Sequence, residues 1–417
     1  MVTVPGGELR RRLGLVDAVT VGLGAMIGAG IFAALAPAAR AAGSGLLVAL
    51  AVAAVVAYCN ATSSARLAAL YPSSGGTYVY GRERLGEFWG YIAGWGFVVG
   101  KSASCAAMAL TVGMYAWPEH AHAVAAGAVL GLTSVNYVGV QKSAWLARVI
   151  VAVVVTVLVV VVVASLVHSP GHPVEVSSTD VTTTGVLQGA GLLFFAFAGY
   201  ARIATLGEEV RDPARTIPRA ISIALAVTLV LYASVATALL WALGPSGLAQ
   251  ASAPIADAAR ATGRSWLVPV ASTTAAVAAL GSLLALVLGV SRTIFAMARD
   301  RHLPHVLAAV HPRFGVPHKA ELLVGVVVAV TAATVDIRTA IGFSSFAVLC
   351  YYAVTNASAA TLSRAEGRPA RLVPVIGLVG CLVLAFSLPV LSVAVGAGVL
   401  AAGAAVYLLR KRRSHDD

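Results

Sequence analysis

Charged side chains are scarce in this 417-residue chain. Asp, Glu, Lys and Arg together make up only 11% of it, whereas an ordinary water-soluble domain carries about 25% charged residues. Apolar residues account for 59% of the chain, and the mean hydropathy is +0.88. This composition excludes an ordinary globular domain in water and predicts an integral membrane protein.

Cysteine is also rare, and the four residues are Cys59, Cys105, Cys350 and Cys381. None forms a Cys-x-x-Cys pair, and all lie in apolar runs, so we predict packing roles for them. We expect no metal and no other cofactor. A membrane enzyme would need a nucleophile with a base, or a metal cluster, and the sequence has no such constellation. We therefore expect a protein that is not an enzyme.

Long polar stretches are missing too, so no segment remains for a sizeable soluble domain. Runs such as Val149–Val163 are continuously apolar, which excludes the alternation of a transmembrane barrel strand. Apolar runs of about 17–25 residues, the length that crosses a bilayer as a helix, recur instead. We predict an all-α integral membrane protein with twelve transmembrane helices. The runs are 15–38, 43–66, 86–113, 121–138, 148–167, 185–206, 218–243, 267–297, 320–335, 340–362, 372–387 and 390–409.

Basic residues outnumber acidic ones, giving a net charge of +12 and a pI near 9.9. In a soluble protein this balance would suggest nucleic acid, but the placement of the charges indicates membrane topology. With the N-terminus inside, most of the 29 Lys and Arg residues fall in inner loops and ends. The outer loops hold Arg40, Arg260, Arg264 and Arg338. We predict a multi-pass protein of the cell membrane, with both termini cytoplasmic and no nucleic acid partner.

Two of the apolar runs are interrupted. The first breaks at 26–31, among several glycines, and the sixth breaks at 194–202, which contains a glycine and ends in an arginine. Interrupted segments at corresponding positions of two halves point to a transporter built from inverted repeats, with its site near the membrane midplane. We therefore predict spans 1–5 and 6–10 as the two repeats. The predicted regions are a cytoplasmic segment at 1–14, the core at 15–362, two extra helices at 372–409 and a basic cytoplasmic tail at 410–417.

The interrupted spans have backbone chemistry that suits an amino acid. Glycines let a ligand approach the backbone, and a half-helix that follows a break presents free N–H groups and a positive dipole end. We expect Gly28, Ala29 and Gly30 to meet a carboxylate. Carbonyls left free where the half-helices end suit an ammonium group. These carbonyls are expected at Met26, Ile27, Phe194, Phe195 and Ala196. An equally weighted alternative is that Gly24 and Gly28 form a small-residue packing face.

Four segments carry a family resemblance: Gly24–Phe32, Tyr71–Tyr80, Gly207–Arg219 and Ala296–Pro304. In this order and at this spacing, they resemble the amino acid–polyamine–organocation transporter superfamily, over residues from about 14 to 365. The resemblance implies a LeuT-type fold with twelve helices, alternating access, and α-amino acids or related amines as substrates. It favours the carboxylate interpretation of the first break over simple packing.

The resemblance also implies roles for aromatic residues of the sixth span. Phe195 stands where relatives have a gating aromatic, Phe197 lies beside it, and Gly199 completes the expected substrate site. Their rings could also face an ammonium group. The alternative is that Phe194, Phe195 and Phe197 are lipid-facing or core aromatics.

The chain departs from the superfamily pattern in its charges. Several relatives place a lysine deep in the fifth span, where its ammonium replaces a sodium ion, but this chain is apolar over 149–155. It has Lys101 in the third span and Arg202 in the sixth instead, and ionisable groups at membrane depth are functional candidates. We hypothesise that Arg202 is a fixed charge and that Lys101 is a proton site or an anion partner. The alternatives are pairing of Arg202 with Glu208 or Glu209, and snorkelling of Lys101 to an interface.

Charged residues of both signs lie at the predicted cytoplasmic mouth. Ion pairs among Glu208, Glu209, Arg299 and Asp300 could gate the inward path, and the alternative is ordinary loop solvation. The nearby histidines, His302, His305, His311 and His318, are expected to be solvated.

The sequence thus predicts secondary active transport of amino acids across the cytoplasmic membrane, coupled to protons or operating by exchange. Two cations near the site, Lys101 and Arg202, favour a neutral amino acid. A cationic amino acid, a polyamine or another amine stays open as the alternative, as does an acidic substrate that pairs with Arg202. A sensor that binds without transport would use the same pocket. The expected partners are the small-molecule substrate, the lipid bilayer and, in the proton-coupled case, protons.

Overall fold

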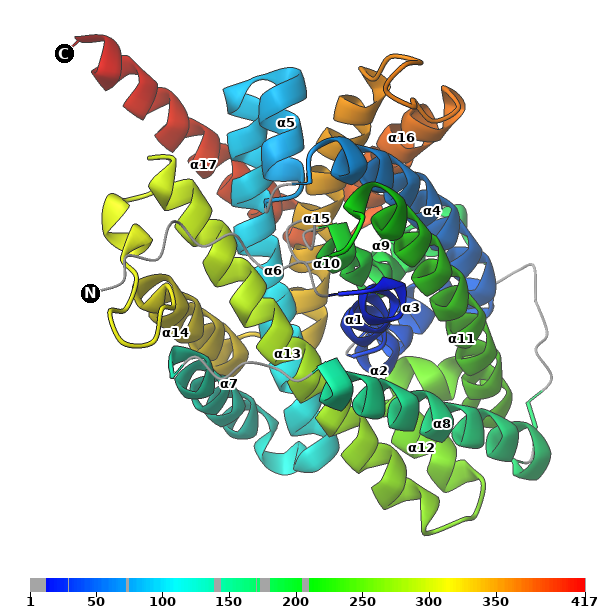
Figure 1. The fold of residues 1–417 in the computed structure, drawn as a ribbon. Coiled ribbons are helices and arrows are strands. Elements are labelled where there is room, and N and C mark those ends of the chain that lie inside the picture. Colours follow the sequence, from blue (N-terminus) through cyan, green and yellow to red (C-terminus); the bar gives the residue numbers. More distant parts are fainter. Residues whose placement is uncertain are drawn as a thin grey trace.

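Helices form almost all of the computed structural model, which describes residues 13–28, 30–72, 75–138, 144–169, 171–172, 181–204 and 210–416 (Figure 1). The all-α prediction is confirmed. The α-helices are α1 (Leu15–Ile27), α2 (Gly30–Ala33), α3 (Leu35–Ala42), α4 (Leu46–Leu70), α5 (Thr77–Leu85), α6 (Glu87–Ala116), α7 (Ala121–Tyr137), α8 (Ala144–His168), α9 (Thr183–Phe197), α10 (Ala201–Ala204), α11 (Pro213–Gln250), α12 (Pro254–Ala261), α13 (Leu267–Arg299), α14 (His318–Thr334), α15 (Ile337–Ala360), α16 (Leu372–Ser387) and α17 (Val390–Asp416). Short 3₁₀ turns are η1 (Gly43–Gly45), η2 (Pro118–His120), η3 (Ala198–Tyr200) and η4 (His305–Ala308).

Among the described residues, every apolar run that the sequence predicts contains helix. Within the described residues, 9 helical segments are long and apolar enough to cross a membrane. Helices α7, α14 and α16 lie on three further runs but have only 17, 17 and 16 residues. At about 1.5 Å per residue these three are at or below the lower limit for a span. The structure therefore supports a multi-helix membrane protein, and the number twelve stays a prediction.

Burial separates central helices from peripheral ones. The most apolar 18-residue windows of α6 and of the α9–α10 segment are 83% and 78% buried, whereas that of α17 is only 17% buried. In lipid a helix needs no polar face because its backbone groups pair internally, so the Val-rich α8 is stable with valines on its outer side. The central helices, by contrast, carry polar side chains that meet partners.

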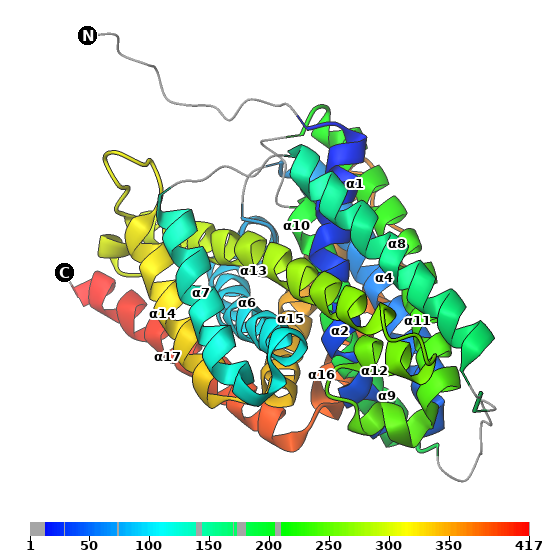
Figure 2. The same cartoon turned by 90° about the horizontal axis from the view of Figure 1, so that it is seen from below.

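The two interrupted helices lie at the centre of the fold. Figure 1 shows α1 to α3 at this centre, with α6 and α13 on one side and α4 and α11 on the other. Figure 2 shows two helix pairs at opposite sides of the molecule, α7 with α14 and α8 with α11. The first break falls between Ile27 and Gly30, and the second is the η3 turn between α9 and α10. Both fall inside the intervals in which the sequence predicts them. Ala29 lies outside the described residues.

A backbone contact joins the segments that precede α1 and α11. Leu13, just before α1, forms an isolated bridge with Val210, just before α11, and the Arg211 N–H donates to the Leu13 carbonyl at 2.9 Å. Helix α11 itself is kinked at Gly244, whose positive φ of 68° and the following Pro245 interrupt the helical backbone.

Candidate substrate site at two broken helices

The two breaks touch each other through glycine. A Cβ atom on Gly199 would lie 2.5 Å from the Ala25 carbonyl carbon, and one on Gly30 would lie 2.4 Å from the Ala196 Cα. Only glycine allows backbones to approach this closely. The broken helices therefore meet break to break, with no side chain between them at these two points.

The space beside Gly28 is also occupied. The Ser282 Oγ of α13 would lie 1.5 Å from a Cβ on Gly28, and this hydroxyl donates to the Gly24 carbonyl at 2.7 Å. Gly28 keeps helical dihedrals, and its N–H donates to Gly24 at 3.2 Å. The expectation of a free N–H is wrong at Gly28, because the last turn of α1 extends through it. Part of the small-residue alternative is thus correct, since Gly28 serves close packing.

Tyr232 of α11 joins the two breaks. Its buried hydroxyl lies 2.6 Å from the Met26 carbonyl oxygen and 3.0 Å from that of Ala196, and it donates to both as a shared hydrogen bond. The expectation of free carbonyls is therefore wrong at Met26 and Ala196. The physical reason is that a buried tyrosine hydroxyl needs an acceptor, and the ends of broken helices supply acceptors.

Lys101 reaches the end of α9. Its side chain is 5% exposed, and Nζ donates to the Ala198 carbonyl at 3.2 Å. The Tyr352 hydroxyl contacts the same carbonyl at 3.4 Å. A cation at the C-terminal end of a helix meets the negative end of its dipole. The ammonium points to the protein centre and not to an interface, so the snorkelling alternative is wrong.

A small cavity of about 70 Å³ lies beside this contact. Lys101, Arg202 and Arg292 all line it, together with Gly199 at the second break. We name it the inner cavity, because the charge pattern of the sequence predicts that this side of the break faces the cytoplasm. The predicted partners of Arg202, Glu208 and Glu209, lie outside the described residues.

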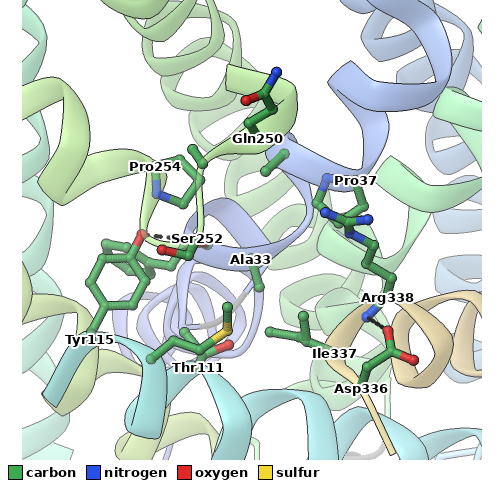
Figure 3. A pocket seen from close by; sticks show the side chains of 14 residues that line it. Ala33, Pro37, Thr111, Tyr115, Gln250, Ser252, Pro254, Asp336, Ile337 and Arg338 are labelled. Carbon is green, nitrogen blue, oxygen red and sulfur yellow. Dashed lines mark hydrogen bonds between the residues drawn. The ribbon is translucent and has the colours of Figure 1, made fainter. Parts of the chain in front are cut away.

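A larger cavity of about 350 Å³ lies on the other side of the first break. Phe32 and Ala33 of α2 line it, and Tyr115 closes part of its wall by donating to the Phe32 carbonyl at 3.1 Å (Figure 3). Asp336 and Arg338 lie at its rim, where the Asp336 carboxylate caps α15 through the Arg338 N–H at 3.0 Å. We name it the outer cavity. The two cavities thus flank the broken helices on opposite sides.

The aromatic residues of α9 are all buried. The Phe194 ring packs on Tyr352 with centroids 5.6 Å apart, and Phe197 packs on Tyr232 with centroids 5.1 Å apart. Phe195 is 7% exposed. The lipid-facing alternative is therefore wrong for these residues, while the core-aromatic alternative describes Phe194 and Phe197.

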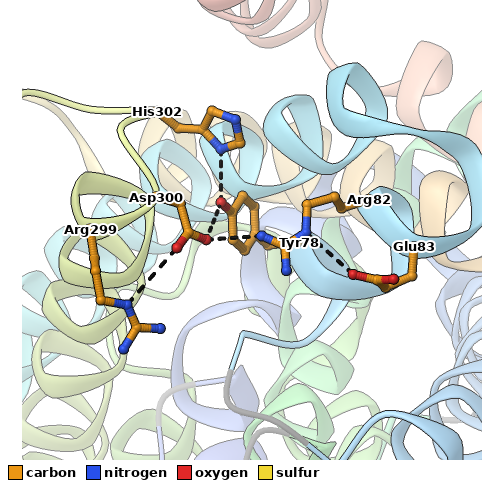
Figure 4. Close-up of polar contacts among 6 residues, drawn as sticks. All are labelled: Tyr78, Arg82, Glu83, Arg299, Asp300 and His302. Atoms are coloured by element: carbon orange, nitrogen blue, oxygen red, sulfur yellow. Dashed lines mark hydrogen bonds and ion pairs between the residues drawn. The ribbon is translucent and has the colours of Figure 1, made fainter.

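Asp300 is the centre of a polar cluster at the C-terminal end of α13. Its Oδ2 accepts from the Tyr78 hydroxyl at 2.7 Å and from Arg82 at 3.0 Å, and the Tyr78 oxygen lies 2.8 Å from His302 Nδ1 (Figure 4). This cluster, which we name the inner lock, ties α5 to the end of α13. Arg299 is a weaker member, at 3.9 Å from Asp300 and largely exposed.

The inner lock also changes proton affinities. Burial lowers the pKa of His302 below its ordinary value of 6.5. Burial, reinforced by the Asp300 carboxylate, raises the pKa of Tyr78 well above its ordinary value. The expectation that His302 is solvated is wrong, because the ring packs against Tyr78, with centroids 5.7 Å apart, and against Tyr91. Tyr78 and His302 are both neutral near pH 7 in this arrangement.

Comparison with known proteins decides the family. A model of the family described as "Amino acid permease" matches residues 13–408. The chain belongs to the amino acid permease family. It is therefore a multi-pass membrane transporter and not an enzyme.

Individual relatives agree with this assignment. The permease is 70% identical to an uncharacterized transporter of Mycobacterium tuberculosis, over 97% of this chain and 92% of the relative. It is 25% identical to the branched-chain amino acid permease BcaP of Bacillus subtilis, over 99% of this chain and 96% of the relative. It is 28% identical to the human cationic amino acid transporter 4, over 87% of this chain and 61% of the relative.

Several residues of the permease site escaped prediction. Tyr232 and Ser282 fill the breaks, and Tyr78, Arg82 and His302 complete the inner lock. Tyr232 could have been singled out from the sequence, because a tyrosine inside an otherwise apolar run needs a buried hydrogen-bond acceptor for its hydroxyl. Tyr78 lay in a segment that carried the family resemblance. Asp300 was predicted at the gate, but its partners were not.

Proposed function

We propose that the permease is a secondary active transporter that carries an amino acid across the cytoplasmic membrane by alternating access. The observation that carries this proposal is the placement of two cavities on opposite sides of one pair of broken helices. A substrate held at the breaks could reach either cavity after a modest rearrangement. The proposal includes twelve membrane helices, a LeuT-type inverted repeat, and both termini in the cytoplasm.

The proposed substrate seat is the segment Gly28–Gly30 facing Phe194–Phe197 and Gly199. The substrate carboxylate would meet backbone N–H groups of the first break beyond Gly28, whose own N–H donates to Gly24. The substrate ammonium would meet carbonyls of Met26, Ile27 and Ala196. In the conformation described, Tyr232 occupies two of those carbonyls, at Met26 and Ala196. Binding therefore displaces this hydroxyl, so that the substrate ammonium takes over hydrogen bonds that the empty site already makes.

The cations of the inner cavity bear on substrate choice and coupling. Lys101, Arg202 and Arg292 would repel the second positive charge of a dicationic ligand, which favours a neutral amino acid. The relative BcaP is named as a branched-chain amino acid permease, which agrees with this choice. The second candidate is a cationic amino acid, because other relatives are named as cationic amino acid transporters. Transport is coupled to protons or runs by exchange, with Arg202 as a fixed charge and Lys101 as a proton site or an anion partner.

Two experiments on purified protein test the proposal. A thermal-shift screen against amino acids and amines should find a neutral amino acid that stabilises the fold, since a ligand specific for the folded state raises stability by mass action. Uptake of that labelled amino acid into proteoliposomes should then exceed uptake into empty liposomes. Binding without uptake would identify a sensor, and stabilisation by cationic ligands alone would favour the second candidate.

A further inference from the structure

The interface between α7 and α14 buries polar atoms that the substrate site does not use. Glu321 on α14 is 0% exposed and Asn136 on α7 is 2% exposed. Within the described residues, both carboxylate oxygens of Glu321 and both amide atoms of Asn136 have no hydrogen-bond partner. Buried polar groups are normally paired, so an unpaired buried carboxylate needs an explanation.

The register of the two helices brings these side chains to one level. Helices α7 and α14 run antiparallel, because His122 contacts the Ala332 carbonyl at 2.7 Å and Thr133 contacts Gly325 farther along. Asn136 lies one turn beyond Thr133, and Glu321 lies one turn before Gly325. Residues three or four apart share a helix face, so both point into the same interface.

His318 connects this interface with the cytoplasmic surface. It stands three residues before Glu321, on the same helix face, and its Nδ1 is buried without a partner among the described residues. The rest of the ring is only partly buried, and it contacts the rings of Tyr137 and His311, at 6.1 Å and 5.3 Å between centroids.

Arg292 connects the same interface with the inner cavity. It projects from α13, it lines the inner cavity, and it is the charged group whose field acts on the Glu321 carboxylate. Other titratable or charged groups lie on α14 and on the segments that pack against it. They are Lys319 on α14, His122 and Tyr137 on α7, His305 on η4, His311, and Lys101 on α6, which is engaged with Ala198.

We propose that Glu321 is a proton-binding site of the transport cycle. On proton binding, an O–H bond forms on the carboxyl and the buried group becomes neutral. On release that bond breaks, the proton passes to the imidazole of His318, and a ring proton of His318 leaves to cytoplasmic water. An unpaired carboxylate is strongly disfavoured in this interface, so its ionisation requires a rearrangement of α7, α13 or α14.

Ionisation of Glu321 also changes the inner cavity. A new negative charge attracts Arg292, which alters the positive charge presented to a substrate there. Proton binding and substrate binding are thereby linked, and linkage of this kind is reciprocal. This inference rests on the proposed transport function and names a coupling ion for it.

The test compares two modes of transport in proteoliposomes, with the substrate found by the thermal-shift screen. Counterflow needs no net proton movement, whereas accumulation driven by an imposed proton gradient does. In Glu321→Gln, which keeps the shape but cannot ionise, the ratio of gradient-driven uptake to counterflow should fall at least about tenfold. The exposed carboxylate of Glu119 gives a matched control, and Glu119→Gln should keep the wild-type ratio.

Two results would overturn the inference. One is an unchanged ratio and an unchanged pH profile in Glu321→Gln. The other comes from the wild-type protein alone, with a pH-sensitive dye in the liposome lumen. The dye should report acidification while substrate is imported. Substrate entry without proton movement, or substrate entry driven by sodium, would contradict the inference. Absence of counterflow in the wild-type protein would instead contradict the transport function itself.

Discussion

The ammonium of Lys101 donates to the carbonyl of Ala198, which places a buried cation on the end of the half-helix that stops at the second break. The donor comes from α6, a helix that is continuous from Glu87 to Ala116. The buried lysine of this chain thus lies in the third predicted span, whereas the superfamily resemblance implies a lysine in the fifth span of several relatives. A positive group at this point balances the helix dipole and borders the inner cavity.

Replacement of Lys101 should separate function from stability. Lys101→Met removes a desolvated charge that donates to the Ala198 carbonyl, so we expect the apparent Tm to stay the same or rise. Uptake should fall at least about tenfold, because the inner cavity loses its charge pattern. Thermal unfolding and proteoliposome uptake of the same preparation measure both effects. Unchanged uptake and unchanged pH dependence in both Lys101→Ala and Lys101→Gln would refute the proton role.

Substitution of Gly30 should disrupt the contact between the breaks. In Gly30→Ala the new methyl group would meet Ala196 backbone at 2.4 Å, and overpacking of this kind typically costs about 1–3 kcal/mol. We expect a lower apparent Tm and loss of uptake. The matched control is Gly131→Ala on α7, where nothing lies within 4 Å of the new atom. That change should be neutral or stabilise by up to about 1 kcal/mol, since alanine is the better helix former. Equal effects of the two substitutions would contradict the close-packing account.

Loss of the Tyr232 hydroxyl should loosen the junction of the two breaks. Tyr232→Phe leaves the Met26 and Ala196 carbonyls without this donor, at a cost of about 1–3 kcal/mol. The apparent Tm in detergent should fall, and an added amino acid substrate should restore more stability than it does in the wild-type protein, because its ammonium replaces the missing donor. Tyr58→Phe, at an exposed position on α4, is the control and should change neither quantity. A Tyr232→Phe protein as stable as wild type would show that the bridge contributes nothing.

The inner lock should respond to mild acid through His302. Its folded pKa is lowered by burial, so the neutral ring contributes stability that is fully present above the unfolded pKa of 6.5. That stability is lost as the pH falls below 6.5 and through the folded pKa. We expect the apparent Tm of the wild-type protein to fall between about pH 7 and pH 5, and the fall to be smaller in His302→Gln. Identical pH profiles for the two proteins would rule out this role of His302.

The helices and their breaks were predictable because they depend on local sequence. Continuous apolar runs predict membrane helices, and glycines inside such a run predict an interruption, as found between Ile27 and Gly30 and again at Ala198–Tyr200. The groups that fill the breaks were not predictable. Tyr232 lies 206 residues from Met26 in the chain, and only the packing of α11 against α1 brings them together.

The inner lock, too, was predictable from the sequence only in its local features. Asp300 stands out in the sequence as a lone acid beside arginines, which is a local feature. Its partners Tyr78 and Arg82 are 222 and 218 residues away. Their contact depends on where α5 docks against the end of α13, and a single sequence does not encode that docking in any readable pattern. Glu321 was not singled out for the same reason, since its isolation follows from the fit of α7 on α14.

The central claim is that the two cavities are alternate exits from one site. Single cysteines test this claim directly. Thr111→Cys reports on the outer cavity, and Thr293→Cys reports on the inner cavity. Each cysteine is labelled by a membrane-impermeant thiol reagent applied to the side on which its cavity opens. The account predicts that substrate changes the two labelling rates in opposite directions. Labelling rates that change in the same direction, or that do not respond to any amino acid that stabilises the protein, would contradict it.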